Sequence, residues 1–193
     1  EVEGGAELRG ADHAVIPDRI EAGTFMVAAA LTGGDIELKG ANALHLGAVR
    51  DKLEEAGVTV QRTNGTIRVF GSATRRPFEI TTMPYPGFPT DMQAQFTALN
   101  AMAEGTGVIT ESVFENRFMH VLELQRMGAQ IKVEGNTTIT TGVPQLKSAP
   151  LMATDLRASA SLVRSGRRSF SSDTRPAMIR SRSSAMAVSW DTP

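Results

Sequence analysis

The sequence predicts a mixed α/β (α+β) protein that is built from repeated βαβαββ units. Three observations lead to this prediction: an Asp opens a helix-like stretch three times, two alternating strand pairs each enclose a tight-turn signal, and equivalent positions recur at nearly constant spacing. Two complete units are expected at about residues 1–75 and 76–145. An incomplete third unit is expected at residues 146–163, followed by a tail at residues 164–193.

Each unit is expected to begin with a helix that an Asp opens. These openings lie at residues 17–21, 89–93 and 153–157, and their acidic residues are Asp18, Asp91 and Asp155. In the first two units the helix continues through a stretch containing Ala and Met and ends at a Gly-rich turn. Short apolar strands follow these turns, at residues 35–38 and 108–110.

A second helix is expected in each complete unit. Its apolar residues recur mainly at spacings of three and four, which places them on one helical face. A Gly follows each helix where a left-handed residue commonly ends it. The residues are Leu46, Val49, Leu53 and Ala56 with Gly57 in the first unit, and Phe118, Val121, Leu122 and Met127 with Gly128 in the second.

Both units are expected to end in a β-hairpin. Alternating segments at residues 58–61 and 66–69 enclose Asn64-Gly65, which is typical of a type I′ turn. Residues 130–133 and 137–140 enclose Gly135-Asn136 in the same way. The first two helix-opening Asp residues are 73 residues apart, and the two helix-ending glycines are 71 apart, so a whole unit is repeated.

The repeat fails in the third unit. Residues 152–163 begin as the earlier helices do, but residues 164–193 are rich in Ser and Arg and show neither helical nor strand periodicity. This tail carries six Arg and two Asp, a net charge of +4. A basic tail could bind RNA or be a disordered linker. We favour a third interpretation, in which the chain is out of register with its own repeat, as after a reading-frame disruption.

Composition limits the class of protein. The 193 residues include 20 basic and 21 acidic side chains, so the overall charge favours neither nucleic acid nor a membrane surface as a partner. The absence of Cys excludes disulfides, thiol nucleophiles and thiolate metal ligands. Apolar runs are far shorter than the roughly 18 residues that span a bilayer. The first residues lack the pattern of a signal peptide, so a cytoplasmic location is expected.

Asp91 is the strongest candidate for chemistry, although a structural role competes with it. Thr90 and Gln93 form a capping-box pattern, and a carboxylate at a helix start favours the helix dipole. Asp18 with Glu21 fits the same structural explanation. Asp91 differs because residues 85–89, rich in aromatics and Pro, place it at an irregular strand-to-helix junction, where a partly desolvated carboxylate can act as a general base.

Three further charged residues are candidates with two possible roles. Arg117 could be a solvated helix residue, or its fork of donors could bind a carboxylate or phosphate. Asp155 and Arg157 pose the same choice. The three His residues have no partner at metal-ligand spacing, so no metal site is predicted, and no Gly-rich phosphate loop precedes a helix. These patterns alone do not identify a reaction.

Two long motifs resemble one enzyme family. Residues 88–96 (FPTDMQAQF) and 115–120 (ENRFMH) are similar to UDP-N-acetylglucosamine 1-carboxyvinyltransferase, the enolpyruvyl transferase of peptidoglycan synthesis. Shorter similarities lie at residues 17–25 (PDRIEAGTF), 103–110 (AEGTGVIT) and 152–163 (MATDLRASASLV). The resemblance is collinear from about the first residue to Val163.

The resemblance implies an inverse α/β barrel in two domains, each with three βαβαββ units around a pseudo-threefold axis, and an active site between them. This chain would be most of the second domain. The implied reaction moves the enolpyruvyl group of phosphoenolpyruvate to the 3′-hydroxyl of UDP-N-acetylglucosamine and releases phosphate through a tetrahedral ketal. This is the first committed step of peptidoglycan synthesis, which serves cell wall biogenesis, cell shape and cell division, and it needs no cofactor.

The resemblance also implies roles for individual residues. Asp91 would contact the sugar hydroxyl and act as the base, and the backbone near Val113 would contact the nucleotide sugar. Arg117 would bind the phosphoenolpyruvate anion. Asp155 would be a second acid/base residue, with Arg157 as a substrate-binding residue beside it.

Two departures from the family pattern lower the expected activity. The first domain is absent, and with it a Lys-Asn pair and a flexible loop that carries Cys or Asp. The Ser/Arg tail stands where the family has an Asp-Arg-Gly-Tyr segment, whose Arg closes onto phosphoenolpyruvate. We therefore expect the chain alone to bind substrates weakly and to turn over negligibly.

Two other functions stay open at this point. The chain could belong to a related enolpyruvyl transferase with another acceptor, such as shikimate 3-phosphate. It could also be a non-catalytic binding module with a basic tail that binds nucleic acid.

Overall fold

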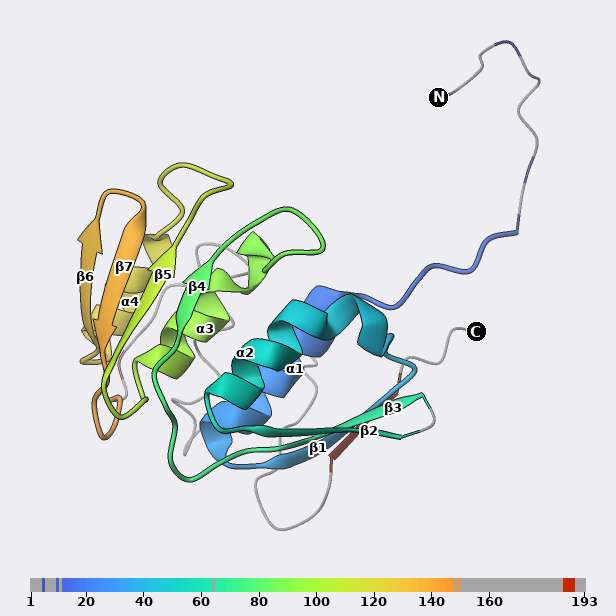
Figure 1. Cartoon of the computed structure of the whole chain (residues 1–193), viewed down its shortest axis with the longest axis horizontal. Helices are drawn as coiled ribbons and strands as arrows, with labels where there is room; N and C mark the ends of the chain where they lie inside the picture. Colours follow the sequence, from blue (N-terminus) through green and yellow to red (C-terminus); the bar gives the residue numbers. More distant parts are fainter. Residues whose placement is uncertain are drawn as a thin grey trace.

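The computed structural model describes residues 5, 10, 12–63, 65–147 and 149, together with the backbone of residues 186–189. The first unit begins with a long helix and ends with a hairpin (Figure 1). Its elements are α1 (Arg19–Thr32), β1 (Asp35–Lys39), the 3-10 helix η1 (Ala43–Leu46), α2 (Gly47–Glu55), β2 (Thr59–Thr63) and β3 (Thr66–Phe70).

The second unit repeats the order of α-helices and strands and adds a strand before its first helix, while its 3-10 helix precedes the first α-helix and not the second. Its elements are β4 (Glu79–Thr81), the 3-10 helix η2 (Thr90–Met92), α3 (Gln93–Asn100), β5 (Thr106–Thr110), α4 (Met119–Arg126), β6 (Gln130–Glu134) and β7 (Thr137–Thr141). The predicted helices and hairpins of both units are confirmed, as are the strands at residues 35–38 and 108–110. The opening strand of the first βαβαββ unit does not appear among the described residues before α1.

The two four-stranded sheets have the same strand order. The first runs β2-β3-β1-β8 and the second runs β6-β7-β5-β4. The strand β8 (Met186–Ser189) lies parallel to β1, in the place that β4 takes beside β5. The sequence pattern did not predict a strand in the tail. The partial third unit at residues 151–163 and the rest of the tail lie outside the described residues, so the out-of-register hypothesis stays a prediction.

Matching backbone hydrogen bonds confirm the internal repeat. The N–H of Gly71 donates to the carbonyl of Gly34 at 2.8 Å, and the N–H of Gly142 donates to Gly105 at 2.8 Å. Both members of this pair are shifted by 71 residues (105 − 34 and 142 − 71). Asp18 and Asp91 are 73 residues apart, which is slightly more. Asp18 directly precedes α1, whereas Asp91 lies within η2, which comes before α3.

The ends of the helices follow the expected local chemistry. Asp18 caps α1 by accepting the N–H groups of Ile20 (2.7 Å) and Glu21 (3.3 Å). Gly57 follows α2 with φ of +90°, as the pattern predicted. One prediction for the second unit is wrong, because the side chain of Leu122 is 65% exposed and Leu124 lies in the core instead.

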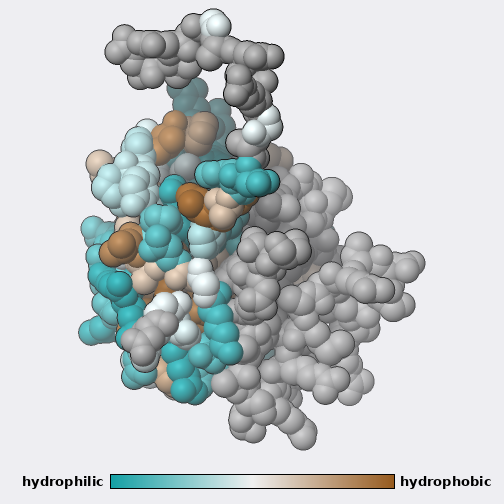
Figure 2. Space-filling model, turned by 90° about the vertical axis from the view of Figure 1, so that its right-hand side faces the viewer, coloured by the Kyte–Doolittle hydropathy of each residue, from teal (hydrophilic) through white to brown (hydrophobic). Residues whose placement is uncertain are grey.

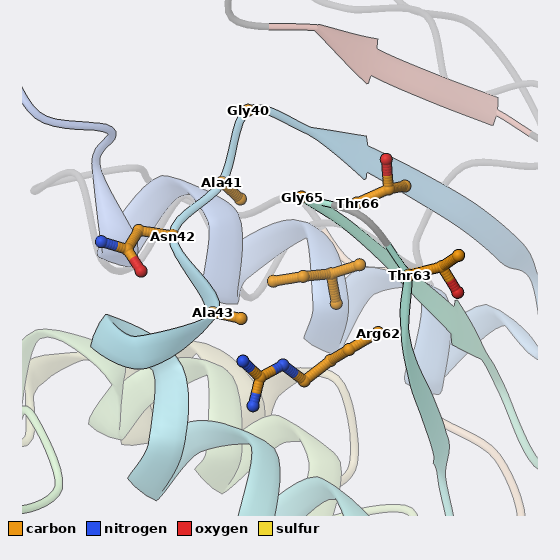
Figure 3. Close-up of a pocket in the computed structure, with 9 residues that line it drawn as sticks. Gly40, Ala41, Asn42, Ala43, Arg62, Thr63, Gly65 and Thr66 are labelled. Carbon is orange, nitrogen blue, oxygen red and sulfur yellow. The ribbon is translucent and has the colours of Figure 1, made fainter.

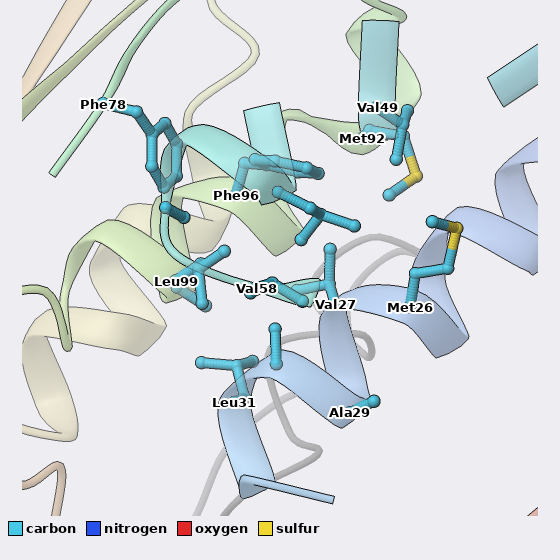
Figure 4. Packing of buried hydrophobic residues seen from close by; sticks show 14 of the residues in the cluster. Met26, Val27, Ala29, Leu31, Val49, Val58, Phe78, Met92, Phe96 and Leu99 are labelled. Atoms are coloured by element: carbon cyan, nitrogen blue, oxygen red, sulfur yellow. The ribbon is translucent and has the colours of Figure 1, made fainter. Parts of the chain in front are cut away.

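The core is continuous across both units. Figure 1 shows the two sheets on the outside, with α1 and α3 between them. Every residue of α3 is buried, since the helix is covered by α1, α4 and its own sheet. Phe96 contacts the rings of Phe78 and Phe88 edge-on, with centroids 5.5 and 4.9 Å away, and Figure 4 shows Met26 and Val27 of α1 facing this region.

The coloured part of the surface in Figure 2 has hydrophobic residues scattered among hydrophilic ones, which is normal for a folded protein. Within the described residues, no helix combines the length and the apolar character that crossing a bilayer requires.

A close backbone approach makes Gly71 a sensitive position. A Cβ atom there would lie 2.3 Å from the carbonyl oxygen of Ala29 and 2.7 Å from the Cα of Gly33. We expect Gly71→Ala to lower the free energy of unfolding by about 1–3 kcal/mol, because backbone must move. Gly47→Ala is the matched control, since its added Cβ would meet no atom within 4 Å in helical backbone. Urea denaturation should show no loss for this control; equal losses in both variants would contradict the prediction.

Candidate active site

Asp91 and Arg117 form an ion pair between two loops. Asp91 lies in η2 at the entry to α3, and Arg117 lies in the loop at residues 111–118 that joins β5 to α4. The Nη2 of Arg117 donates to Oδ1 of Asp91 at 2.6 Å. The Arg117 side chain is 14% exposed and that of Asp91 is 46% exposed. The structure therefore brings together two of the predicted site residues, with the carboxylate facing the outside.

The guanidinium of Arg117 is held from two more sides. Its Nη1 donates to the hydroxyl oxygen of Thr90 at 2.6 Å, and its Cζ lies 4.6 Å from the ring centre of Phe114. An Arg side chain has five N–H donors. The two hydrogen bonds use two of them, and no described residue takes the other three. A fixed guanidinium with donors to spare can bind an incoming carboxylate or phosphate.

Behind this pair lies a buried carboxylate, Glu111, which is 1% exposed. Its Oε1 accepts the hydroxyl of Thr82 (2.7 Å) and the backbone N–H groups of Val113 (2.8 Å) and Phe114 (3.2 Å). Its Oε2 accepts the hydroxyl of Thr90 (2.7 Å) and the amide of Gln93 (3.1 Å). These five donors satisfy an anion that burial would otherwise disfavour.

Burial and hydrogen bonding shift the pKa of Glu111 in opposite directions. Burial raises the pKa of this carboxyl, while the hydrogen bonds from Thr82, Thr90 and the two backbone N–H groups lower it. The net result is a pKa below the usual range, so Glu111 is ionised at neutral pH. The site thus contains two carboxylates and one guanidinium.

The capping box predicted for Thr90 and Gln93 is wrong. Neither side chain caps the helix, and both donate to Glu111 instead. The physical reason is that an ionised acceptor forms stronger hydrogen bonds than a backbone group. Glu111 was not among the residues predicted for the site. The available signal was an acidic residue directly after an apolar strand, at the position where the first unit has Gly40.

Val113 has its N–H occupied by Glu111, so only its carbonyl and its 37% exposed side chain can face a ligand. Among the described residues of the first unit no similar pair is seen, and Asp18 caps its own helix. Asp155 and Arg157 lie outside the described residues, and their roles stay predictions.

The cavity drawn in Figure 3 lies at another place in the first unit. Its volume is about 750 Å³, and its lining comes from residues 40–43, 62–63 and 65–67. No predicted site residue lines it. The ion pair, the buried carboxylate and the two long motifs at residues 88–96 and 115–120 all lie in the second unit, so the chemistry points there rather than to this cavity. Among the described residues, no group of three His, Cys, Asp or Glu side chains could hold a metal ion.

Two repeated units, each with a four-stranded sheet that packs on an inner helix, have the architecture of an enolpyruvyl transferase fold. The chain belongs to the EPSP synthase (3-phosphoshikimate 1-carboxyvinyltransferase) family, whose sequence model matches residues 1–191.

Solved structures agree with this assignment. The chain is similar to the enolpyruvyl transferase NikO from Streptomyces tendae, with 32% identity and a TM-score of 0.67 over 77% of this chain and 36% of that one. It is also similar in fold to EPSP synthase from Acinetobacter baumannii, with 17% identity and a TM-score of 0.58 over 80% of this chain and 37% of that one. The chain thus spans little more than a third of either protein.

The lowered pKa of Glu111 predicts a pH dependence of stability. The unfolded carboxyl has a pKa of about 4.3, so between that value and the lower folded-state pKa the unfolded chain binds more protons. The stabilisation is therefore complete above the unfolded pKa and is lost as the pH falls through the folded-state pKa. Urea denaturation from pH 7 to pH 3 should show this loss in the wild type and a flatter curve in Glu111→Gln.

Glu115→Gln is the matched control, because it removes one negative charge from an exposed side chain of the same loop. Its curve should run parallel to that of the wild type. A Glu111→Gln curve that is also parallel would show that Glu111 contributes nothing to the pH dependence.

Proposed function

We propose that this chain supplies one side of the active site of an enolpyruvyl transferase that uses phosphoenolpyruvate and UDP-N-acetylglucosamine. The product would be the enolpyruvyl ether at the 3′-hydroxyl of the sugar, with release of phosphate. The cell would use this reaction in peptidoglycan synthesis in the cytoplasm, and neither nucleic acid nor a membrane would be a partner. The choice of acceptor rests on the resemblance at residues 88–96 and 115–120.

The observation that carries the proposal is the 2.6 Å contact between Arg117 and Asp91. A sugar hydroxyl is a poor nucleophile, so a positioned carboxylate must accept its proton, which contributes on the order of 10²–10⁴-fold to the rate. Phosphoenolpyruvate carries a carboxylate and a phosphate, which a guanidinium neutralises by hydrogen bonds. A base next to an anion-binding group is therefore the arrangement that this reaction needs.

The reaction would proceed in two stages. Asp91 accepts the proton of the acceptor hydroxyl, whose oxygen bonds to C2 of phosphoenolpyruvate while C3 gains a proton. The resulting tetrahedral ketal then loses phosphate from C2 and a proton from C3, which restores the double bond. Asp155 would be the group that gives and takes the C3 proton.

The remaining part of the active site would come from a partner domain. The loops that carry Asp91 and Arg117 expose apolar side chains, and among them Tyr85 is 57% and Phe114 is 55% exposed. Tyr85 also lies under the guanidinium of Arg19, 5.0 Å from it. Apolar residues around a charged pair would exclude water when a second domain closes over the site, which strengthens the electrostatic interactions inside it.

A related acceptor is the second candidate, because the matched family is described by transfer to 3-phosphoshikimate. Isothermal titration calorimetry of the chain with UDP-N-acetylglucosamine and with shikimate 3-phosphate compares the two directly. We expect weak heats with the first acceptor and none with the second. The reverse result would assign the other acceptor. A salt-dependent shift of oligonucleotides with no heat from either acceptor would favour the non-catalytic nucleic-acid-binding module.

Substitutions of the ion pair test the proposed roles. In a complete polypeptide that includes the first domain, we expect Asp91→Asn to lower kcat by about 10²–10⁴-fold, because the base is lost. Arg117→Lys should raise KM for phosphoenolpyruvate by roughly 10–100-fold, since a charged hydrogen-bond fork is lost. Phosphate release measures both effects, and the chain alone should release phosphate negligibly.

The control for Asp91→Asn is Asp18→Asn at the equivalent helix start. Asn still caps a helix, so this change should leave kcat within about twofold. An Asp91→Asn enzyme with wild-type kcat would remove Asp91 from the mechanism.

A further inference from the structure

We propose that Glu111 is a positioning residue, which holds Asp91, Val113 and Arg117 in one arrangement through a single buried carboxylate. This inference rests on the proposed function for its catalytic meaning. Its geometric content, the orientation of the Arg117 guanidinium, does not depend on any substrate.

The carboxylate connects the two loops that carry the site. Through Oε1 it binds the N–H of Val113 and so sets the backbone of the loop at residues 111–118. Through Oε2 it binds Thr90, the neighbour of Asp91. The hydroxyl of Thr82 adds a further connection to the same loop, because it donates to Glu111 and accepts the N–H of Ser112 at 2.9 Å.

Thr90 transmits the position of Glu111 to Arg117. A hydroxyl group has one proton and two lone pairs. The proton of Thr90 is donated to Oε2 of Glu111, so its lone pairs are left to accept from Nη1 of Arg117. The polarity of this chain of hydrogen bonds depends on an acceptor at position 111.

The isosteric amide cannot replace this carboxylate. All five groups around Glu111 donate, and Gln offers one oxygen and one NH₂ group. Whichever way the amide turns, its NH₂ faces donors. If it faces Thr90, the hydroxyl must accept from it and loses the acceptor that fixed its own proton, so the amide and Arg117 compete for its lone pairs. Glu111→Gln should therefore weaken the contact between Thr90 and Arg117.

The fold itself does not require a carboxylate at this position. The first unit builds the same strand, loop and helix with Gly40 at the equivalent place, 71 residues earlier (111 − 71). The five donors around Glu111 are also neutral, so no direct ion pair offsets the desolvation of this anion. A buried charge that one repeat has and the other lacks is better explained by the site that only the second repeat contains.

The test is the NMR spectrum of the arginine side chains in the ligand-free 193-residue chain. A guanidinium fixed by Thr90 and Asp91 rotates slowly about its Nε–Cζ bond, so Arg117 should give separate Nη–H signals, which Arg117→Lys identifies. We expect Glu111→Gln to speed this rotation about tenfold or more, because a hydrogen bond to a charged group is lost. Backbone amide signals of β1 and β3 report whether the fold remains.

Two further variants separate positioning from stability. Thr90→Val removes the relaying hydroxyl and should speed the rotation as Glu111→Gln does, while Thr90→Ser keeps the hydroxyl and should leave it slow. Slow rotation in both Glu111→Gln and Thr90→Val would overturn the proposal, even if both proteins are less stable. If Glu111→Gln does not fold, the rotation rates of the Arg117 guanidinium in Thr90→Val and Thr90→Ser test the proposal.

Failure of the proposed function gives a different result. If the wild-type chain binds neither UDP-N-acetylglucosamine nor phosphoenolpyruvate while the variants change the rotation as expected, then Glu111 still positions Arg117 and the assigned reaction is wrong. If binding is observed and the rotation does not respond to Glu111→Gln, the reaction stands and the positioning role is wrong.

Discussion

The packing of α1 against α3 is the constraint on which the rest of the structure depends. Each unit has one sheet with an apolar face, and neither sheet can cover that face alone. The two inner helices lie between the sheets and join both cores into one, and Phe96 of α3 contacts the rings of Phe78 and Phe88 edge-on. Because α3 is buried on all sides, the residues at its entry are held on a rigid base, and these include Asp91.

The site arises where the two repeats differ. At the start of the inner helix, Asp18 caps the helix in the first repeat. In the second repeat, η2 precedes the helix and Asp91 forms an ion pair with Arg117. After the following strand, the first repeat has Gly40 and the second has Glu111. The common fold therefore supplies the scaffold, and the Asp91–Arg117 pair and Glu111 are the features described for the second repeat.

The same comparison explains how a family fold can support different acceptors. In the proposed reaction, the carboxylate of Asp91 would accept the hydroxyl proton and the guanidinium of Arg117 would bind the phosphoenolpyruvate anion, whichever acceptor is used. The loops around them also expose large side chains such as Tyr85, which lies outside the hydrogen bonds of Glu111 and could face an acceptor. Membership of the EPSP synthase family accordingly establishes the fold, whereas the transfer and its acceptor belong to the proposal.

The sequence by itself determined the repeat, the order of helices and strands, and Asp91 and Arg117 as candidates, because periodicity, turn residues and capping residues act over a few neighbours. It failed for Leu122 and for the Thr90–Gln93 capping box, since both outcomes depend on what lies across the fold. Only the tertiary structure brought Glu111 to Thr90, which is 21 residues away in the chain. A buried carboxylate acts through partners on several segments, and no local pattern records which segments will meet.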